Sequence, residues 1–398
     1  MRIEFRVDIN VDDIVPEEGG FFGDGVNAPA RLRALAEPGD NGHNQEAKTP
    51  GPAMWAGGPR EDTMRASTLF LAVGVLSMTT AAHAQYKAWV LSKFDDTPEG
   101  LTVDKDGNYY TALFHTGKIM KVTPDGQQEL IATIPPDSNA HHGDTVGVEL
   151  DNKGNLYVAY KQDSPRYEAS DLRDPFHAAC RDIKVTASGV YKIELATRKV
   201  TALATRADGW PFCFPDDVDI DDQGNVYMTD LTYSGIWKIS PDGKKVDLWS
   251  ADPLLNWSPQ PYSGFPLGVN DLAIAPDGKS IYAVTDGDPM VVKVPITADG
   301  TAGKVTIVAR GFSPFDGIAF DDKGNIYVSE ILRSELWVLS PDGSKRALVA
   351  NKKMAPQDDN TSLAWYKGTI CTANLGFTHQ KPEQADKTIV CIRGYDMP

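Results

Sequence analysis

The chain has 398 residues and a formal net charge of −16, from 55 Asp and Glu against 39 Lys and Arg. Such an acidic chain is repelled by nucleic acid and by anionic membrane surfaces, so neither is an expected partner. The sequence contains no Walker loop, no GxGxxG motif after a strand and no GxSxG elbow. These absences argue against a phosphate-binding loop, a dinucleotide-binding unit and an α/β-type serine hydrolase.

The first 84 residues are predicted to lie outside the folded unit. Residues 1–63 are acidic, rich in Gly and Pro and without hydrophobic periodicity, which is typical of disorder. The pair Met64-Arg65, the apolar run LFLAVGVLSM and the tripeptide Ala82-His83-Ala84 form the pattern of a secretory signal peptide over residues 64–84. The apolar run is about ten residues long, too short to span a bilayer of roughly 30 Å. A buried core strand is the alternative, but no hairpin partner precedes it.

A signal peptide acts only at the N-terminus of a chain. Met64 is therefore the expected start of translation, and residues 1–63 are a disordered or spurious extension. The mature protein is expected to begin at Gln85, after Ala84, and to be periplasmic or secreted.

One short phrase recurs six times after residue 100. Each copy is an alternating apolar run, a polar turn that contains Gly, and a second run with β-branched or aromatic residues, which is the pattern of a β-hairpin. The copies are LTVDKDGNYYTAL, VELDNKGNLYVAY, VDIDDQGNVYMTD, LAIAPDGKSIYAV, IAFDDKGNIYVSE and LAWYKGTICTAN. The turn glycines are Gly107, Gly154, Gly224, Gly278, Gly324 and Gly368, which are 44 to 70 residues apart. A repeat of this length made only of strands is typical of a propeller blade.

Further strand patterns complete the blades. A third apolar run follows every hairpin, and a fourth follows five of them; the sixth lacks one because the chain ends. The segment YKAWVLSKF, from Tyr86 to Phe94, is predicted to supply the missing outer strand. The predicted fold is therefore all-β: a six-bladed β-propeller over residues 85–398, whose last blade is closed by the N-terminal strand of the mature chain.

Four cysteines fit an oxidising compartment. Cys371 and Cys391 fall in neighbouring strands of the last blade, and Cys180 and Cys213 both fall in long connections around blade 3. Of the three connectivities that four cysteines allow, we prefer Cys371–Cys391 with Cys180–Cys213; four unpaired buried thiols are the alternative. The cysteine and histidine spacings do not suggest a zinc site.

The first strand of each propeller blade lines the central channel, so equivalent residues converge at one end of the axis. Alignment of the six hairpins by their turn glycines gives one residue at the head of each inner strand. These head residues are Glu99, Val146, Asp216, Asn270, Asp316 and Thr361. Three carboxylates and an amide thus meet in a place of low dielectric, where like charges repel unless a cation neutralises them.

Oxygen ligands from acids and amides suit a hard cation, and Ca²⁺ tolerates irregular geometry better than Mg²⁺. The sequence therefore predicts one calcium ion on the axis, held by Glu99, Asp216, Asn270 and Asp316. The alternative is a water-filled channel lined with polar groups.

The same residues carry a resemblance to a known family. PEGL from Pro98, FPDDVDIDDQGNVYMTD from Phe214, VNDLAIAPDGKSIY from Val269 and FDGIAFDDKGNIYVSE from Phe315 resemble the metal-site motifs of the senescence marker protein/gluconolactonase family. Calcium-dependent lactonases, paraoxonases and diisopropyl-fluorophosphatases are relatives of that family. The resemblance extends over residues 86 to about 398, and it implies a six-bladed propeller with one metal and a hydrolytic activity.

Two positions depart from the family pattern. The third-blade Asn is Asp216 here, and Phe214 stands where the sugar-lactone branch often has Arg. An aromatic residue in place of a cation indicates a substrate less polar than a sugar lactone.

The resemblance implies that a bound cation polarises a lactone or ester carbonyl while a carboxylate activates water or attacks directly. We assign that role to Asp316, with Asp216 as the second candidate and Glu99 and Asn270 as pure ligands. The long connections before blades 3 and 4 are expected to supply substrate-binding walls. The candidates are Trp210, Phe214, Trp257 and Tyr262, with inter-blade packing as the alternative for each. His142, with His141 beside it, is a further candidate for substrate contact or base catalysis, unless it is a solvated loop residue.

The leading hypothesis is a secreted or periplasmic calcium-dependent hydrolase of lactones or related esters. A non-catalytic propeller that binds a ligand or a protein, with structural calcium, is the second hypothesis. A strictosidine-synthase-like condensing enzyme is the third, and it does not require a complete metal tetrad. The expected partner is a small-molecule substrate, and we expect a monomer without a membrane span.

Overall fold

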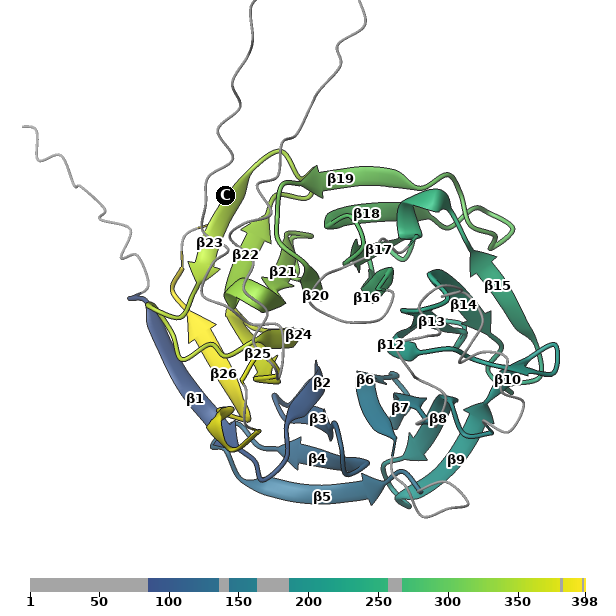
Figure 1. Ribbon diagram of the computed structural model, residues 1–398, viewed down its shortest axis with the longest axis horizontal. Helices are drawn as coiled ribbons and strands as arrows, with labels where there is room; N and C mark the ends of the chain where they lie inside the picture. The colour runs from purple at the N-terminus through teal and green to yellow at the C-terminus, as the bar shows by residue number, and fades with distance from the viewer. Residues whose placement is uncertain (1–84, 136–142, 163–185, 257–266, 380–381, 396) are drawn as a thin grey trace, which may run out of the picture. The chain divides into compact units, whose positions relative to one another are not determined.

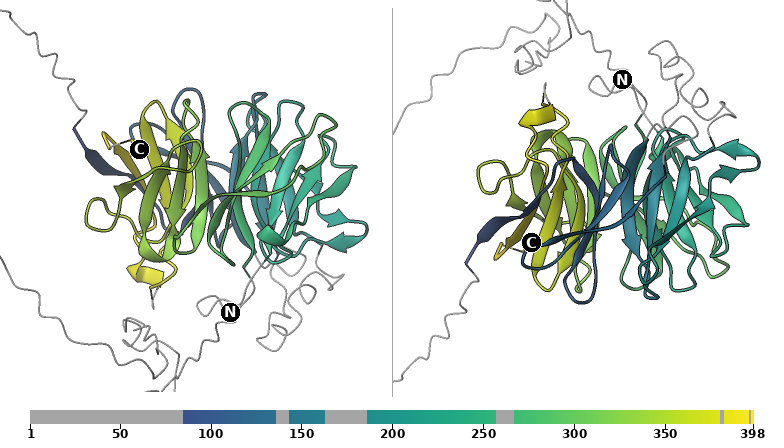
Figure 2. Two further views of the ribbon diagram at one scale, coloured as in Figure 1. Left: turned by 90° about the horizontal axis from the view of Figure 1, so that it is seen from above. Right: turned by 90° about the horizontal axis from the view of Figure 1, so that it is seen from below.

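The computed structural model describes residues 85–135, 143–162, 186–256, 267–379, 382–395 and 397–398. Within these residues, six four-stranded antiparallel sheets stand in a ring around one axis (Figure 1). Seen from the side, the sheets stand upright beside one another (Figure 2). The predicted six-bladed β-propeller is confirmed. The predicted signal peptide and the extension before it lie outside the described residues, and no described helix is long and apolar enough to cross a membrane.

The strands of blades 1 to 3 run in chain order from the axis outward. Blade 1 consists of β2 (Pro98–Val103), β3 (Tyr109–Leu113), β4 (Lys118–Val122) and β5 (Gln128–Thr133). Blade 2 consists of β6 (Asp144–Leu150), β7 (Asn155–Lys161), β8 (Gly189–Glu194) and β9 (Lys199–Ala204). Blade 3 consists of β12 (Pro215–Ile220), β13 (Val226–Asp230), β14 (Gly235–Ile239) and β15 (Val246–Ser250).

Blades 4 to 6 complete the ring. Blade 4 consists of β16 (Val269–Ile274), β17 (Ser280–Thr285), β18 (Met290–Pro295) and β19 (Thr306–Arg310). Blade 5 consists of β20 (Phe315–Phe320), β21 (Ile326–Glu330), β22 (Glu335–Leu339) and β23 (Arg346–Ala350). Blade 6 consists of β24 (Asn360–Tyr366), β25 (Thr369–Asn374), β26 (Thr388–Arg393) and β1 (Lys87–Lys93).

A few short elements lie outside the six sheets. The strands β10 (Arg206–Ala207) and β11 (Trp210–Pro211) form a small hairpin before blade 3. The described residues also contain three single-turn 3-10 helices: η3 (Pro253–Leu255) between blades 3 and 4, η4 (Ile331–Arg333) within blade 5 and η5 (Pro382–Gln384) within blade 6.

The recurring turn has a physical reason for its sequence. In blade 1, Asp104 Oδ1 accepts hydrogen bonds from the backbone N–H groups of Asp106 and Asn108, and Asn108 Nδ2 donates to Asp104 Oδ2 at 2.8 Å. Gly107 completes the turn with a φ of 86°, which a residue without Cβ adopts readily. The same set of bonds joins Asp151 to Asn155, Asp221 to Asn225 and Asp321 to Asn325.

The N-terminal strand closes the ring, as predicted. β1 pairs antiparallel with β26, with Trp89 opposite Cys391 and Lys87 opposite Arg393. Blade 6 therefore draws its outer strand from one end of the folded unit and its inner three strands from the other. This pairing ties both ends into one sheet.

Apolar clusters fill the space between neighbouring blades. The cluster between blades 6 and 1 contains Phe94, Leu101, Cys371 and Ile389, and the other five blade boundaries have equivalent clusters. Such burial is the main favourable contribution to folding. The predicted disulfide between Cys371 and Cys391 is present, joining β25 to β26. The pair Cys180–Cys213 stays a prediction, because Cys180 lies outside the described residues.

Removal of β1 should destabilise the propeller. A chain that starts at Phe94 leaves β26 as an unpaired edge strand, which is open to aggregation, whereas a chain that starts at Gln85 keeps the ring closed. We expect the shorter chain to melt at lower temperature and to aggregate on heating, as measured by calorimetry and light scattering. Equal melting of the two chains would contradict the closure role of β1.

Loss of the disulfide should lower stability without changing the fold. The bond closes a loop of 20 residues, for which the chain-entropy model gives about 3 kcal/mol. Urea unfolding of Cys371→Ala/Cys391→Ala should show a decrease of this size. The double variant is a sharper probe than a reducing agent, which acts on every disulfide. An unchanged unfolding midpoint would contradict the prediction.

Candidate functional site

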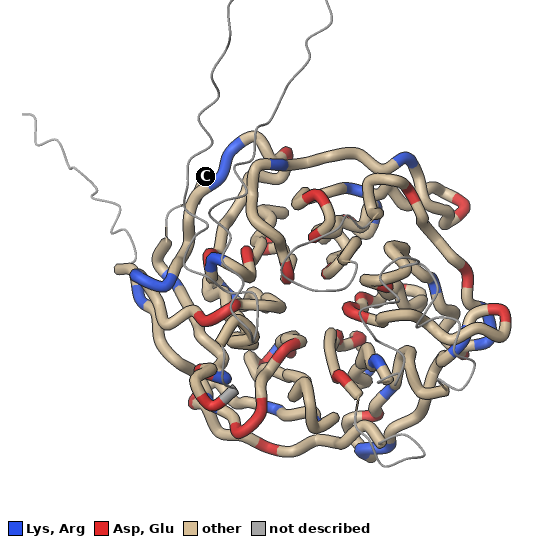
Figure 3. Tube along the Cα trace, viewed as in Figure 1, with Lys and Arg blue, Asp and Glu red and all other residues tan. Residues whose placement is uncertain are grey.

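Every inner strand carries a register irregularity at its head residue. In blade 1, the pairing of the first two strands shifts register between Pro98 and Leu101. The other five blades shift register at the equivalent place. A bulge re-aims the side chain of the extra residue. The head residues are thereby turned toward the axis, where several Asp and Glu positions gather (red in Figure 3).

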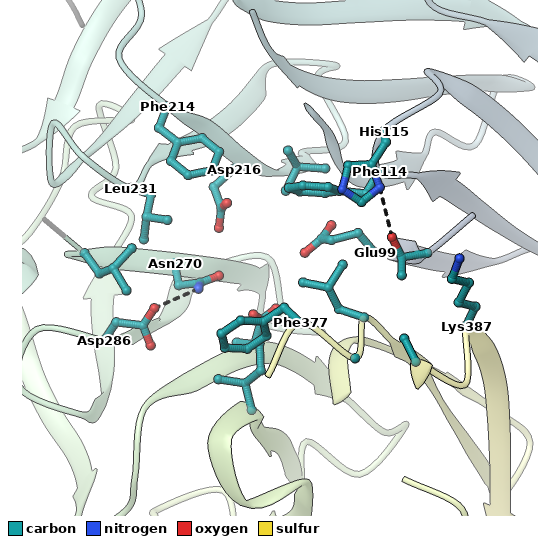
Figure 4. Close-up of a pocket in the computed structure, with 18 of the residues that line it drawn as sticks. Glu99, Phe114, His115, Phe214, Asp216, Leu231, Asn270, Asp286, Phe377 and Lys387 are labelled. Carbon is teal, nitrogen blue, oxygen red and sulfur yellow. Dashed lines mark hydrogen bonds between the residues drawn. The ribbon is translucent and has the colours of Figure 1, made fainter. Parts of the chain in front are cut away.

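The four predicted metal ligands line one cavity of about 450 Å³. Glu99, Asp216, Asn270 and Asp316 come from four different blades, and the first three are labelled in Figure 4. Val146 lines the same cavity. The sixth head residue, Thr361, is buried and donates its hydroxyl hydrogen to the Glu99 carbonyl oxygen at 2.9 Å.

Crowding at the axis explains the glycines that follow Glu99 and Asp316. A Cβ on Gly100 would collide with the Val146 carbonyl oxygen of the next blade, and a Cβ on Gly317 would collide with that of Thr361. Asp217 and Asp271 occupy the equivalent position in blades 3 and 4. Their carboxylates accept hydrogen bonds from the backbone N–H groups of Leu272 and Ile318, in the following blade.

The three head carboxylates have strongly perturbed acidities. Burial raises the pKa of Glu99, Asp216 and Asp316 well above the ordinary carboxyl range. Repulsion adds to the effect, because Asp316 raises the pKa of both Glu99 and Asp216. Buried like charges of this kind occur at functional sites.

The donor set fits a hard cation. Glu99 Oε2 is buried without a hydrogen-bond partner, and carboxylate and amide oxygens are the donors that Ca²⁺ prefers. The donors line the cavity from separate blades; within the described residues, Asp, Glu, His and Cys side chains do not form a compact group of three or more. The residues present can therefore supply oxygen ligands, although not as a preassembled shell.

Asp286 is a fifth polar group of the cavity that sequence reasoning missed. It directly follows β17 and accepts a hydrogen bond from Asn270 Nδ2 at 3.0 Å (Figure 4). Burial raises the pKa of Asp286 to about 8, with a further increase from Asp216 and an opposing effect of the Asn270 bond. The bond fixes the orientation of the Asn270 amide. Alignment of the residues after the second strands would have indicated this position.

Apolar side chains form most of the cavity wall. Phe214, a predicted wall residue, is among them, whereas Trp210 is not and is 53% exposed. Trp257, Tyr262, His141 and His142 lie outside the described residues. The wall residues that sequence reasoning missed are Phe114, Leu231, Leu267, Ile331, Leu375 and Phe377.

Three basic residues line the rim of the cavity, and each is bonded to the protein. His115 Nδ1 lies 2.9 Å from Asp96 Oδ1. His379 Nε2 lies 2.8 Å from Asp358 Oδ1, and Lys387 Nζ donates to a backbone carbonyl oxygen at 3.1 Å.

The fold and the site together define a class: a six-bladed propeller with acidic and amide head residues at the base of one cavity. Residues 144–368, more than half of the chain, match the model of the "SMP-30/Gluconolactonase/LRE-like region". The protein belongs to this family, and the resemblance noted in its motifs is confirmed.

Solved structures show the same fold. A gluconolactonase from Xanthomonas campestris has a TM-score of 0.56 and 13% identity, over 78% of this chain and 90% of that one. A structure described as a "putative gluconolactonase" has a TM-score of 0.52 and 17% identity, over 78% and 92%. At these identities the likeness concerns the fold alone.

One curated protein matches a short segment. A stretch of 37 residues, 9% of this chain, is 54% identical to a part of "Putative adenylate cyclase 3" of Rhizobium meliloti (strain 1021). The match spans 6% of that protein's length, so it carries no argument about this chain.

The ion pair at the rim gives a pH-dependent prediction. Burial alone would raise the pKa of Asp96, but hydrogen bonds from His115, Thr116 and Thr97 hold it at about 2. The bond to Asp96 in turn raises the pKa of His115, against the effect of burial. The His115 contribution to stability is therefore complete below its unfolded pKa and is lost as pH rises through the folded pKa. The Asp96 contribution is lost only as pH falls toward about 2.

An NMR titration of His115 in the wild type and in Asp96→Asn should show a lower pKa in the variant. Urea unfolding should show that the variant's loss of stability is larger at pH 5 than above the folded pKa of His115. Identical titration of His115 in both proteins would contradict the pairing.

Proposed function

We propose that the protein is a calcium-dependent hydrolase that opens lactones or related esters. The observation that carries this proposal is the convergence of three buried carboxylates and one amide, from four blades, at the base of a cavity with apolar walls. Membership of a family named after gluconolactonase supports it. The cavity beside these groups has room for a small molecule, which a purely structural role would not require.

Glu99, Asp216, Asn270 and Asp316 would hold the cation. When bound, calcium supplies a Lewis acid that polarises the substrate carbonyl and stabilises developing negative charge. Asp286 keeps the Asn270 amide oriented through the 3.0 Å bond, in the manner of an outer-shell partner. Thr361 holds the backbone of Glu99 at its carbonyl oxygen.

Asp316 is assigned to accept the proton of the attacking water, with Asp216 as the second candidate. The water oxygen forms a bond to the acyl carbon, the bond from that carbon to the ring oxygen breaks, and the ring oxygen takes the proton that Asp316 accepted from the water. The product is a hydroxy acid. The apolar walls keep bulk water away from the reacting atoms.

We further propose that the protein acts outside the cytoplasm, after cleavage between Ala84 and Gln85. The disulfide between Cys371 and Cys391 is typical of proteins from oxidising compartments. Mass spectrometry of the protein from its native host tests this: a mature N-terminus at Gln85 is expected, and retention of residues 1–84 would contradict it.

Substitutions in blade 3 and blade 5 should separate binding from chemistry. Asp216→Asn removes one ligand charge and should weaken calcium binding by about tenfold, or about 1.4 kcal/mol. Asp316→Ala should lower lactone hydrolysis by about 10²- to 10⁴-fold, the usual contribution of a general base. Titration calorimetry measures the first effect, and a panel of lactones and aryl esters with and without chelator measures the second.

Asp222→Asn is the matched control, because Asp222 is an exposed acid in the hairpin turn of the same blade as Asp216. It should leave calcium affinity and activity unchanged. A wild-type protein that binds no calcium, or hydrolysis that is insensitive to the chelator, would overturn the calcium dependence. Absence of hydrolysis across the panel would overturn the enzymatic function.

A further inference from the structure

In five blades the residue directly after the second strand occupies one equivalent place, and in blade 2 that place is occupied by Lys161, the last residue of β7. The backbone N–H of Phe114 donates to the Thr97 carbonyl oxygen, and equivalent bonds position four of the other residues. We call these six residues the collar. They are Phe114, Lys161, Leu231, Asp286, Ile331 and Leu375. Four members of the collar are apolar, and all four line the cavity above the head residues.

The polar members of the collar do not offer a polar wall. Lys161 binds Asp144 with its ammonium group at 2.7 Å and lies over the Phe214 ring at 5.0 Å. Asp286 is bonded to Asn270 beside the head residues. The collar therefore presents an apolar surface to the cavity, apart from the carboxyl group of Asp286.

A separate apolar cluster strengthens this surface. Val146, Phe214, Leu231 and Leu267 pack together with Phe114 against them. The six other clusters fill the boundaries between blades, whereas this one faces the cavity. Ile331, Leu375 and Phe377 also line the cavity. Phe377 lies across the cavity from Phe214 (Figure 4) and is 43% exposed.

Polar side chains at the rim are already bonded within the protein. His379 lies within 2.9 Å of both carboxylate oxygens of Asp358. His115 lies against Asp96, and Lys387 against a backbone carbonyl oxygen. Among the described residues, the hydroxyl groups of a polyhydroxylated substrate would meet mainly apolar atoms and few polar partners, which weakens binding.

We propose that the substrate is a lactone or ester whose ring or acyl group carries an uncharged alkyl or aryl substituent, and not a polyhydroxylated sugar lactone. This inference rests on the proposed hydrolytic function and specifies its substrate class. The reacting carbonyl lies at the head residues, and the substituent lies against Leu231, Phe214 and Phe377. These side chains determine specificity by contact with the part of the substrate that does not react.

The test is a series of γ-alkyl-γ-butyrolactones of increasing chain length, with glucono-δ-lactone as the polar comparison and calcium present throughout. Each methylene that is buried against the wall should raise kcat/KM by about fourfold, which corresponds to about 0.8 kcal/mol. Glucono-δ-lactone should be the poorest substrate. The full chain, processed by its host, is the enzyme used.

Two variants probe the wall from opposite sides. Leu231→Asn places an amide in the collar, and Phe377→Ser removes an exposed ring that the fold does not require. Both should reduce the gain per methylene to less than about twofold, mainly through KM. Leu248→Asn is the matched control, because Leu248 lies on the outer strand of the same blade as Leu231 and is 38% exposed. It should retain the full chain-length dependence.

Calorimetric measurement of the binding of unreactive 2-alkylcyclopentanones separates the proposed substrate class from the proposed hydrolytic function. If lactones are hydrolysed without any dependence on chain length, or glucono-δ-lactone is preferred, the inference is overturned and the hydrolytic function stands. If no lactone is hydrolysed, the proposed function fails. In that case, ketone affinity that increases with chain length and decreases in Leu231→Asn supports the apolar site, and affinity without such dependence overturns it.

Discussion

The close approach of six inner strands around one axis determines both the architecture and the chemistry of this protein. Gly100 and Gly317 have no room for a Cβ, because the backbone of the next blade occupies that space. The bulge in each strand turns the head residue into the same restricted volume. Carboxylates from different blades are thus held together out of water, and their pKa values rise through burial and mutual repulsion.

Similar acids have different roles along this axis. Asp217 and Asp271 follow the head residues and accept hydrogen bonds from backbone N–H groups of the next blade, so they join blades 3, 4 and 5 at a position where blades 1, 2 and 5 have glycine. Glu99 Oε2 has no such partner. Hydrogen bonds to the charged form compensate a buried carboxylate, whereas a carboxylate without them carries an uncompensated cost. Asp217 and Asp271 thus connect neighbouring blades, although burial raises the pKa of both. The unpartnered oxygen of Glu99 is available to bind a ligand.

The acidic head residues and apolar side chains line the same cavity. Leu231 and Phe214 exclude water from the region above Asp216 and Asp316, and electrostatic interactions are stronger where the dielectric is low. The same walls leave few polar partners for a substrate. The proposed reactivity and the proposed selectivity therefore depend on one arrangement, because the same apolar residues line the cavity around the head residues and would contact the non-reacting part of a ligand.

The sequence by itself determined the blade count, the closing strand, one disulfide and the convergence of Glu99, Asp216, Asn270 and Asp316. The four head residues repeat at a fixed offset from the turn glycines, and the repeat fixes their symmetry-related places. Only the tertiary structure decided which side chains form the wall: it joined Phe114, Leu231, Ile331 and Leu375 at the ends of second strands and left Trp210 outside. Wall contacts depend on how far neighbouring blades separate and where connections fold over them. Those distances arise from packing between blades, which no single repeat encodes.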